Sequence, residues 1–191
     1  KSGGDRIYFR IVTEDNSYIA TYNENIRENE TFLHFTQHFR KINSPVPLIY
    51  TVHPDGKMYI QQYFGGTSLL NELEKHGQDD YVYDLFKKSL KSLAELQIKA
   101  SKNFDYSYCL TSKEFGKQAI LSDLLYFKYY FLDTLKIAYD KEKLIDDFDA
   151  LSNYLTHVRY KYIMFRDFQS RNIYIQNNEV HFIDYQGGMK G

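Results

Sequence analysis

The stretch IMFRDFQSRNIYI (residues 163–175) decides the fold, together with VHFIDYQGG (180–188). Each is an apolar run of strand-forming residues that polar side chains interrupt. The dipeptide Asn177-Asn178 lies between them, and such a pair is typical of the tight turn that joins two antiparallel strands. The sequence therefore predicts a short hairpin whose outer ends lie side by side.

Three polar residues at those outer ends carry side-chain oxygens: Asp167, Asn172 and Asp184. Because the ends of the hairpin meet, we expect the three side chains to face one point. Carboxylate and amide oxygens suit Mg²⁺, which takes one or two carboxylates and fills its octahedron with water and phosphate oxygens. Phosphoryl transfer needs that metal and a further aspartate that orients the attacking hydroxyl. Turns and helix caps also use these residue types, so it is their combination with the hairpin that favours a functional site.

The composition bounds the class of protein. The chain has 191 residues, of which 43% are apolar and 26% charged, as is typical of a globular protein with its own core. The net charge of −1 gives no reason to expect a nucleic acid or a membrane surface as a partner. The single cysteine, Cys109, cannot form an internal disulfide, and no apolar run approaches the ~18 residues of a membrane span. We therefore expect a cytoplasmic protein.

Residues 1–64 have the patterns of a small strand-rich lobe with one helix. Alternation of apolar and polar residues predicts strands over 6–12 and 17–22, and a further pair of strands around the Pro-Asp-Gly turn at 54–56. Phenylalanines at helical intervals predict a helix over 28–41, which the prolines that follow must end.

The remainder, 65–191, is predicted to be a mainly helical lobe that carries the hairpin. Helical patterns occur in four places: a short helix capped by Ser68, then 81–100, 113–138 and 141–158. The fold class is thus α+β with two lobes, joined by a connection at 62–67. The chain begins at Lys1 and ends without a closing helix, so we expect an excerpt of a longer protein that is truncated at the C-terminus.

The motifs FRDFQSRN (165–172) and IDYQG (183–187) resemble the catalytic loop and the metal-binding segment of the protein-kinase-like superfamily, whose signatures are H-R-D-x-x-x-x-N and D-F-G. Within it, they look like the aminoglycoside phosphotransferase and sugar-kinase branch. SGGDRIYFRI (2–11) and ENETFLHFTQHF (28–39) narrow the resemblance to bacterial phosphotransferases similar to the anomeric kinases of N-acetylmuramate and N-acetylglucosamine. The resemblance implies a protein-kinase-like fold and an ATP-dependent transfer of the γ-phosphoryl group to a hydroxyl of a small molecule, with an amino sugar favoured.

The resemblance also implies a role for each polar residue of the hairpin. Asp167 would be the catalytic base that positions the acceptor hydroxyl, with Arg166 beside it to support the loop. Asn172 and Asp184 would hold Mg²⁺ against the phosphates of ATP. Six residues would bind the nucleotide: Gly3, Gly4 and Arg6 in a phosphate-covering loop, and Gln62, Tyr63 and Phe64 in the hinge that reads the adenine edge.

One departure from the family pattern keeps a second class of function open. The strand at 17–22 has no lysine, whereas protein kinases grip the phosphates with a lysine there. Lys1 or Arg6 is the candidate substitute, and Glu28 or Glu30 is the acid that would pair with it. Without that lysine the chain could be a nucleotide-binding pseudokinase or regulatory module, although the intact aspartates and asparagine argue against this class. A kinase that acts on other proteins is a third and weaker alternative.

A cluster of aromatic residues lies in the predicted helix over 113–138: Tyr126, Phe127, Tyr129, Tyr130 and Phe131. Aromatic side chains on a helix usually belong to the core, so we expect these to be buried, with stacking on a sugar or a base as the alternative. Glu114, Asp123 and Lys128 in the same region could help an acceptor site, but solvated helix faces are the default expectation.

Overall fold

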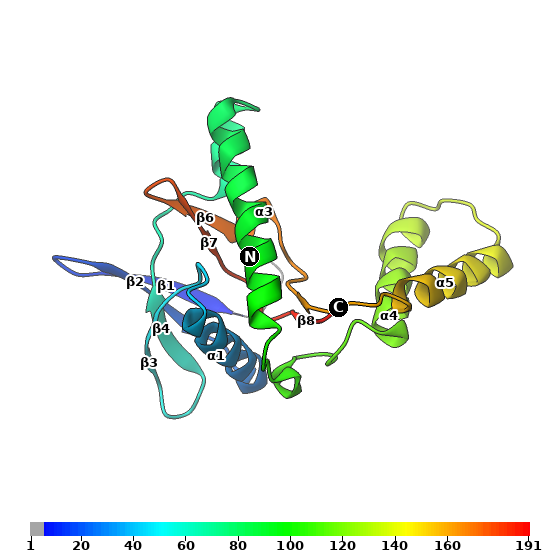
Figure 1. The fold of residues 1–191 in the computed structure, drawn as a ribbon, viewed down its shortest axis with the longest axis horizontal. Helices are drawn as coiled ribbons and strands as arrows, with labels where there is room; N and C mark the ends of the chain where they lie inside the picture. The colour runs from blue at the N-terminus through cyan, green and yellow to red at the C-terminus, as the bar shows by residue number, and fades with distance from the viewer. Residues whose placement is uncertain (1–5) are drawn as a thin grey trace.

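The computed structural model describes residues 6–191. Gly3 and Gly4, predicted to cover the phosphates, and the candidate phosphate ligand Lys1 lie outside the described residues. The α+β class and the two-lobed arrangement are those that the sequence predicts, with a sheet first and helices with a hairpin after it (Figure 1). The division of the chain at residues 64 and 65 stays a prediction.

A four-stranded antiparallel sheet forms the first part of the described chain (Figure 1). Its strands lie in the order β1-β2-β4-β3. Their bounds are β1 (Ile7–Val12), β2 (Ser17–Tyr22), β3 (Ile49–Val52) and β4 (Met58–Gln62). The turn between β3 and β4 includes Gly56, whose φ of +71° is a conformation that glycine adopts without steric strain.

Helix α1 (Ile26–Lys41) packs on this sheet through phenylalanine side chains. It begins two residues earlier than the apolar pattern predicts, because the Asn25 side chain caps it by accepting from the backbone N–H of Glu28 at 3.2 Å. Phe32 stacks on Tyr59 of β4, with ring centroids 5.3 Å apart. Burying such aromatic pairs fixes the helix against the sheet.

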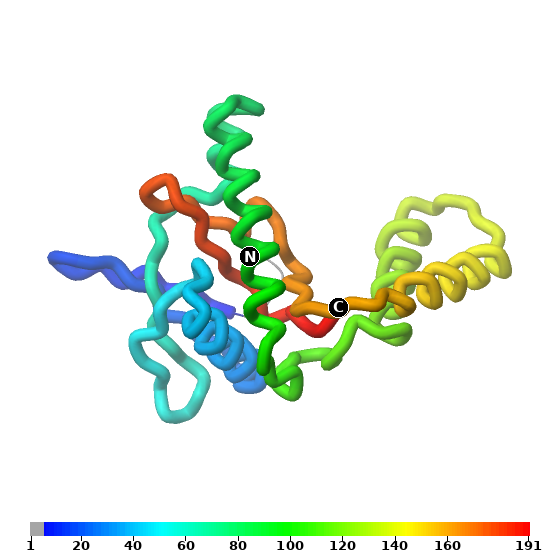
Figure 2. The backbone as a smooth tube through the Cα atoms, viewed as in Figure 1, coloured from blue at the N-terminus to red at the C-terminus, as the bar shows by residue number. Residues whose placement is uncertain are grey.

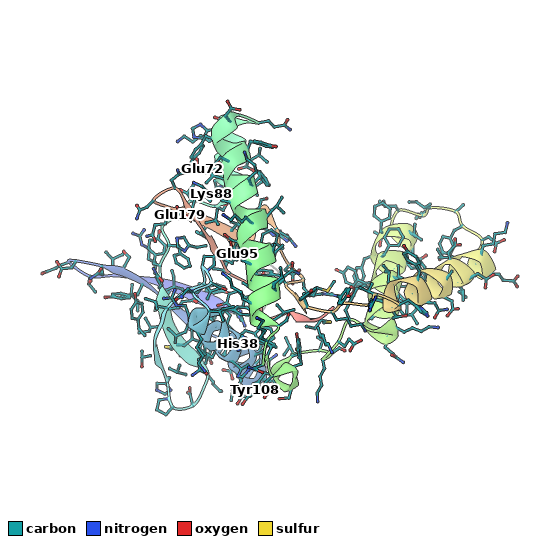
Figure 3. The ribbon with its side chains drawn as sticks, in the orientation of Figure 1. His38, Glu72, Lys88, Glu95, Tyr108 and Glu179 are labelled. Carbon is teal, nitrogen blue, oxygen red and sulfur yellow. The ribbon has the colours of Figure 1, made fainter. Side chains whose placement is uncertain are left out.

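The second part begins with α2 (Leu69–His76), capped by Ser68 as predicted, and α3 (Asp80–Ala100). Helix α3 makes hydrogen bonds with two other parts of the chain. Lys88 donates to the carbonyl oxygen of Asn178 at 3.0 Å, and so joins α3 to the turn of the hairpin (Figure 3). At the other end of the helix, a ring nitrogen of His38 on α1 lies 2.8 Å from the carbonyl oxygen of Ala100 (Figure 3).

The predicted hairpin is present as β6 (Ile173–Gln176) and β7 (Glu179–Phe182). Asn177 and Asn178 form its turn with φ of +53° and +62°, the left-handed conformation that asparagine tolerates better than most residues. Two further short strands pair with each other on either side of these residues. β5 (Ile163–Met164) precedes residues 165–172, and β8 (Met189–Lys190) follows the glycine pair at 187–188.

A helical hairpin, α4 (Lys117–Phe127) and α5 (Lys141–Thr156), extends away from the rest of the chain (Figure 2). A π-helical turn, η2 (Lys128–Asp133), continues α4. The helix predicted over 113–138 begins only at Lys117, because the residues before it are extended. There the N–H of Phe115 donates to the carbonyl oxygen of Lys190 at 2.7 Å. The helix predicted over 141–158 ends at Thr156.

The aromatic cluster of α4 and η2 lies on the surface, so the expectation of burial was wrong. Its five side chains are between 44% and 66% exposed. The helical pattern predicts a face that packs in the core. In the structure α4 packs mainly against α5 and η2, and its outward side is exposed to solvent. No helix among residues 6–191 combines the length and the apolar character needed to cross a bilayer.

Candidate active site

The loop between β5 and β6 is held by its own backbone hydrogen bonds. The N–H of Gln169 donates to the carbonyl oxygen of Asp167 at 2.9 Å, and the N–H of Asn172 donates to that of Gln169 at 2.8 Å. Phe165 takes the position of the histidine in the kinase signature, is buried, and packs edge-to-face against Phe168 at 5.3 Å. An apolar anchor thus supports the loop where the signature has a histidine.

The three polar residues line one cleft, and the side chain of Asn172 contacts the side chain of Asp184 and the backbone of Asp167. The Asn172 amide donates to the carbonyl oxygen of Asp167 at 3.0 Å and to the carboxylate of Asp184 at 3.1 Å. With both N–H groups engaged in this way, the Oδ1 of Asn172 is left as an acceptor. One asparagine therefore connects the loop before β6 with the segment after β7.

Two residues of the site adopt a backbone conformation that is costly for side chains with a Cβ. Arg166 has φ of +71° and Asp184 has φ of +65°. Each such residue costs on the order of 1–3 kcal/mol, and residues of this kind cluster at functional sites. The surrounding contacts of both side chains hold the strained backbone in place.

Arg166 is held by Asp123 of α4. The two side chains form a bidentate ion pair with N–O distances of 2.7 and 3.1 Å, and the guanidinium lies 5.1 Å from the ring centroid of Phe115. This pair links the helical hairpin to the residue before Asp167. From the sequence, Asp123 could lie on a solvated helix face or in an acceptor site, because the packing of the helical hairpin decides which residue it contacts.

Arg6 and Glu28 form an ion pair within the cleft. Their N–O distance is 3.1 Å, and their side chains are only 7% and 21% exposed. Glu30, the other acid that was considered, instead pairs with Arg27 at 3.8 Å in an exposed position. Of the alternatives within the described residues, Arg6 with Glu28 is the pair that faces the site.

Tyr185 joins α1 to the segment that carries Asp184. Its ring is buried and stacks on Phe32 with centroids 5.1 Å apart, and its hydroxyl lies 2.5 Å from the Thr36 hydroxyl. Burial in this apolar surrounding raises the pKa of Tyr185, so the hydroxyl stays neutral. The role of Thr36 was missed, because a threonine among phenylalanines gives no pattern of its own.

The glycine pair leaves no room for side chains. A Cβ on Gly187 would lie 3.1 Å from the Asp167 carboxylate, and one on Gly188 would lie 3.0 Å from the carbonyl oxygens of Met164 and Tyr185. A side chain at Gly187 would therefore push the Asp167 carboxylate aside by a few tenths of an ångström, whereas one at Gly188 would meet backbone atoms.

Two cavities meet at this loop. A cleft of about 710 Å³ lies between the sheet and the hairpin, and its walls include the predicted site residues Arg6, Gln62, Tyr63, Phe64, Asp167, Asn172 and Asp184. A second cavity of about 410 Å³ lies below the loop, and its walls include Asp123, Arg166, Asp167 and the rings of Phe115 and Phe168. Asp167 lines both cavities.

The hinge residues differ in what they can offer. The backbone N–H of Gln62 donates to the carbonyl oxygen of Leu48 at 2.8 Å, and therefore cannot donate to a ligand. The ring of Phe64 is buried and stacks on His181 with centroids 4.2 Å apart. Arg10 lies 4.5 Å from the ring centroid of Tyr63. The side chains of Tyr63 and Phe64 are thus engaged with Arg10 and His181, and the role of the three residues in binding a nucleotide stays a prediction.

The donor set fits a hard divalent cation. Asp184 and Asn172 offer oxygen atoms, and the buried side-chain oxygen of Gln186 beside them has no hydrogen-bond partner. Within residues 6–191 there is no cluster of three or more His, Cys, Asp or Glu that could hold a metal ion. Proteins bind Mg²⁺ through few carboxylates, and water and phosphate oxygens complete its coordination shell.

The ionisation of Asp167 is tuned by its neighbours. Burial of the carboxyl group and the negative charge of Asp184 raise the pKa of Asp167 above its ordinary value, and the charges of Arg166 and Arg171 oppose the shift. A carboxylate with a raised pKa is a stronger base than an ordinary aspartate.

The fold is similar to that of solved aminoglycoside phosphotransferases. A thermostable mutant of aminoglycoside phosphotransferase APH(4)-Ia aligns with a TM-score of 0.58 and 16% identity, over 100% of this chain and 67% of that chain. APH(2″)-IIa in complex with gentamicin aligns with a TM-score of 0.62 and 15% identity, over 96% and 63%. ADP-bound APH(2″)-Ib aligns with a TM-score of 0.57 and 17% identity, over 98% and 67%.

This chain thus spans about two thirds of the length of those structures. In sequence it matches no protein-family profile and no curated protein. The sheet, the helix on it, the loop and the hairpin all fall within the alignment to APH(4)-Ia, which covers 100% of the chain. The chain therefore has the protein-kinase-like fold in the form that aminoglycoside phosphotransferases take.

Proposed function

We propose that the protein is an ATP-dependent phosphotransferase that moves the γ-phosphoryl group to a hydroxyl of a small molecule. The observation that carries the proposal is the position of Asp167, which lines both the 710 Å³ cleft and the 410 Å³ cavity. Cavities of several hundred Å³ are of the size that binds cofactors and small substrates. A donor on one side of Asp167 and an acceptor on the other would leave its carboxylate at the point of transfer.

Each residue then has a defined task on the nucleotide side. Backbone groups of Tyr63 and Phe64 read the adenine, and the Arg6–Glu28 pair directs a cation at the phosphates. Asn172 and Asp184 would hold Mg²⁺, which when bound neutralises charge on the phosphate oxygens. Phosphoryl transfer demands positioning and charge stabilisation more than covalent chemistry from the protein, and these residues supply both.

On the acceptor side, Asp167 accepts the hydroxyl proton and orients the attacking oxygen. Because its pKa is raised, its carboxylate accepts that proton more readily than an ordinary aspartate does. The rings of Phe115 and Phe168 offer apolar faces to a sugar ring. Asp123 is paired with Arg166, so the Asp167 carboxylate is the group in this cavity that suits an amine. These features support an amino sugar. Among the structures of similar fold, one contains gentamicin and another hygromycin B with AMP-PNP.

The proposal is tested by titrating Mg²⁺·AMP-PNP into the protein in a calorimeter. Saturable binding that requires Mg²⁺ is expected, and Asp184→Asn should weaken it at least tenfold, because the site loses its charged metal ligand. Asp146→Asn, an exposed carboxylate on α5, is the matched control and should bind like the unmodified protein. A panel of amino sugars is then assayed with ATP. Magnesium-dependent binding with no phosphorylated product from any hydroxyl acceptor would favour the pseudokinase alternative.

The ion pair of the cleft gives a second prediction. Glu28→Gln removes the charge that holds Arg6, so we expect the dissociation constant of Mg²⁺·AMP-PNP to rise about tenfold, as for other partners that orient a ligand-binding group. Glu30→Gln on the same helix breaks the exposed pair with Arg27 and should change the constant by less than about twofold. Equal effects of the two substitutions would contradict the assignment of Glu28.

A further inference from the structure

Gln186 connects two acidic side chains that come from opposite ends of the chain. Its Nε2 donates to Asp184 at 2.9 Å and to Glu28 at 3.4 Å. The side chain is 9% exposed, so these contacts lie in the interior of the cleft wall. Since both partners are carboxylates, which only accept, the orientation of the amide is fixed with its NH₂ group toward them.

The contact at Glu28 also reaches Arg6. The same Oε1 of Glu28 that accepts from Gln186 pairs with the Arg6 guanidinium at 3.1 Å, and its Oε2 accepts from Asn23 at 3.0 Å. A continuous chain of hydrogen bonds thus runs from Arg6 through Glu28 and Gln186 to Asp184. It joins the strand side of the cleft to the hairpin side.

The oxygen of the Gln186 amide is buried and has no hydrogen-bond partner in the described chain. Buried acceptors of this kind are rare, because leaving one unpaired is unfavourable. Gln186 lines the 710 Å³ cleft beside Asp184, where a bound cation would carry water molecules. Such a water would supply the missing donor.

We propose that Gln186 is a positioning residue that couples the phosphate-binding cation Arg6 to the metal-binding carboxylate Asp184. It does so by donating hydrogen bonds to the carboxylates of Glu28 and Asp184. Its free oxygen accepts a hydrogen bond from a water molecule of the hydrated metal. A glutamine is required because a carboxylate here would repel Glu28 and Asp184, and an apolar side chain would leave Asp184 with one donor fewer. This inference rests on the proposed function of the same site.

The test uses Gln186→Met, which keeps the volume and removes both donors and the acceptor. The affinity for Mg²⁺·AMP-PNP is measured by calorimetry as the Mg²⁺ concentration varies, and compared with binding of AMP-PNP in EDTA. We expect the Mg²⁺-dependent affinity to fall about tenfold or more, as for other groups that orient a metal ligand. Without Mg²⁺, the affinity for AMP-PNP should change by less than about threefold. Gln186 would then act on the nucleotide only indirectly, through Glu28 and Arg6.

Gln61→Met is the matched control. Gln61 lines the same cleft and is 8% exposed, its oxygen is likewise unpaired, but its amide donates to Thr21 at 3.3 Å. It should keep the Mg²⁺ dependence of the unmodified protein. Should Gln186→Met fold poorly, Gln186→Asn keeps the amide in a smaller side chain that is too short to span both carboxylates, and the same loss is expected.

Coupling is measured directly by combining Gln186→Asn with Glu28→Gln. If Gln186 acts through Glu28, the losses of affinity in the double variant are less than the product of the single losses. Multiplicative losses, or wild-type Mg²⁺ dependence in Gln186→Asn, overturn this inference while the unmodified protein still binds the nucleotide. An unmodified protein without Mg²⁺-dependent binding overturns the proposed function, and this inference with it.

Discussion

Replacing Asp167 by asparagine is expected to lower the rate of phosphoryl transfer by about 100- to 10,000-fold, the range that a general base contributes. Asparagine has the same shape and cannot accept the hydroxyl proton. Binding of Mg²⁺·AMP-PNP should change little, because Asn172 and Asp184, the proposed metal ligands, remain. Rates come from single-turnover assays with ATP and an accepted sugar, and binding from calorimetry.

The pH dependence gives the same prediction a second readout. Because the pKa of Asp167 is raised above its ordinary value of 3.8, the carboxylate gains its proton at a higher pH than a free aspartate does. Transfer should therefore fall as the pH decreases through that raised pKa, and the acid limb should disappear from the residual activity of the asparagine variant.

The stability of the asparagine variant serves as the control. A carboxyl group whose folded-state pKa is raised contributes stability that is present below its unfolded pKa and lost as the pH rises through the folded pKa. Asparagine does not ionise, so the variant does not lose this stability as the pH rises. At neutral pH its melting temperature should therefore be no lower than that of the unmodified protein. A variant that melts much lower, or that retains the rate, would show that Asp167 is structural and not a base.

Phe35→Ala is expected to lower the free energy of unfolding by about 3–5 kcal/mol, as large-to-alanine changes of buried phenylalanines do. The ring is 0% exposed, lies 4.8 Å from the centroid of Phe104 and 5.9 Å from that of Phe39, and is close to the backbone of Gly188. Its removal leaves a cavity among α1, the loop that carries Phe104 and the glycine segment.

Chemical denaturation followed by circular dichroism measures this loss. Phe9→Ala on β1 is the control, because that ring is 55% exposed, and its removal should cost less than about 1 kcal/mol. A loss of similar size for both variants would mean that the phenylalanines of α1 do not form the centre of the core.

Most of the local structure around the site follows from the sequence. The asparagine pair predicts the turn of the β6–β7 hairpin because few other residues tolerate two successive positive φ angles. The spacing of Phe32, Phe35 and Phe39 predicts the buried face of α1. Once the hairpin is predicted, the meeting of Asp167, Asn172 and Asp184 follows from strand pairing alone.

The contacts that the sequence does not predict are those set by how distant elements pack. Arg6 lies just before β1 and Glu28 lies on α1, and only the position of the helix on the sheet decides that they meet rather than Arg6 and Glu30. The sequence misplaces the start of α4 because the residues before Lys117 run extended and pair with Lys190, which lies about seventy positions further along the chain. The aromatic residues of α4 show a helical pattern, but a pattern does not say whether another element covers the face.

The ion pair of Arg166 with Asp123 has a consequence for how such proteins diversify. The helical hairpin packs mainly upon itself, and this pair joins it to the loop that carries Asp167. Under the proposed function, substitutions on the far side of the helical hairpin would leave the residues around Asp167 in place, whereas a change at Asp123 would release Arg166 and alter the wall of the 410 Å³ cavity.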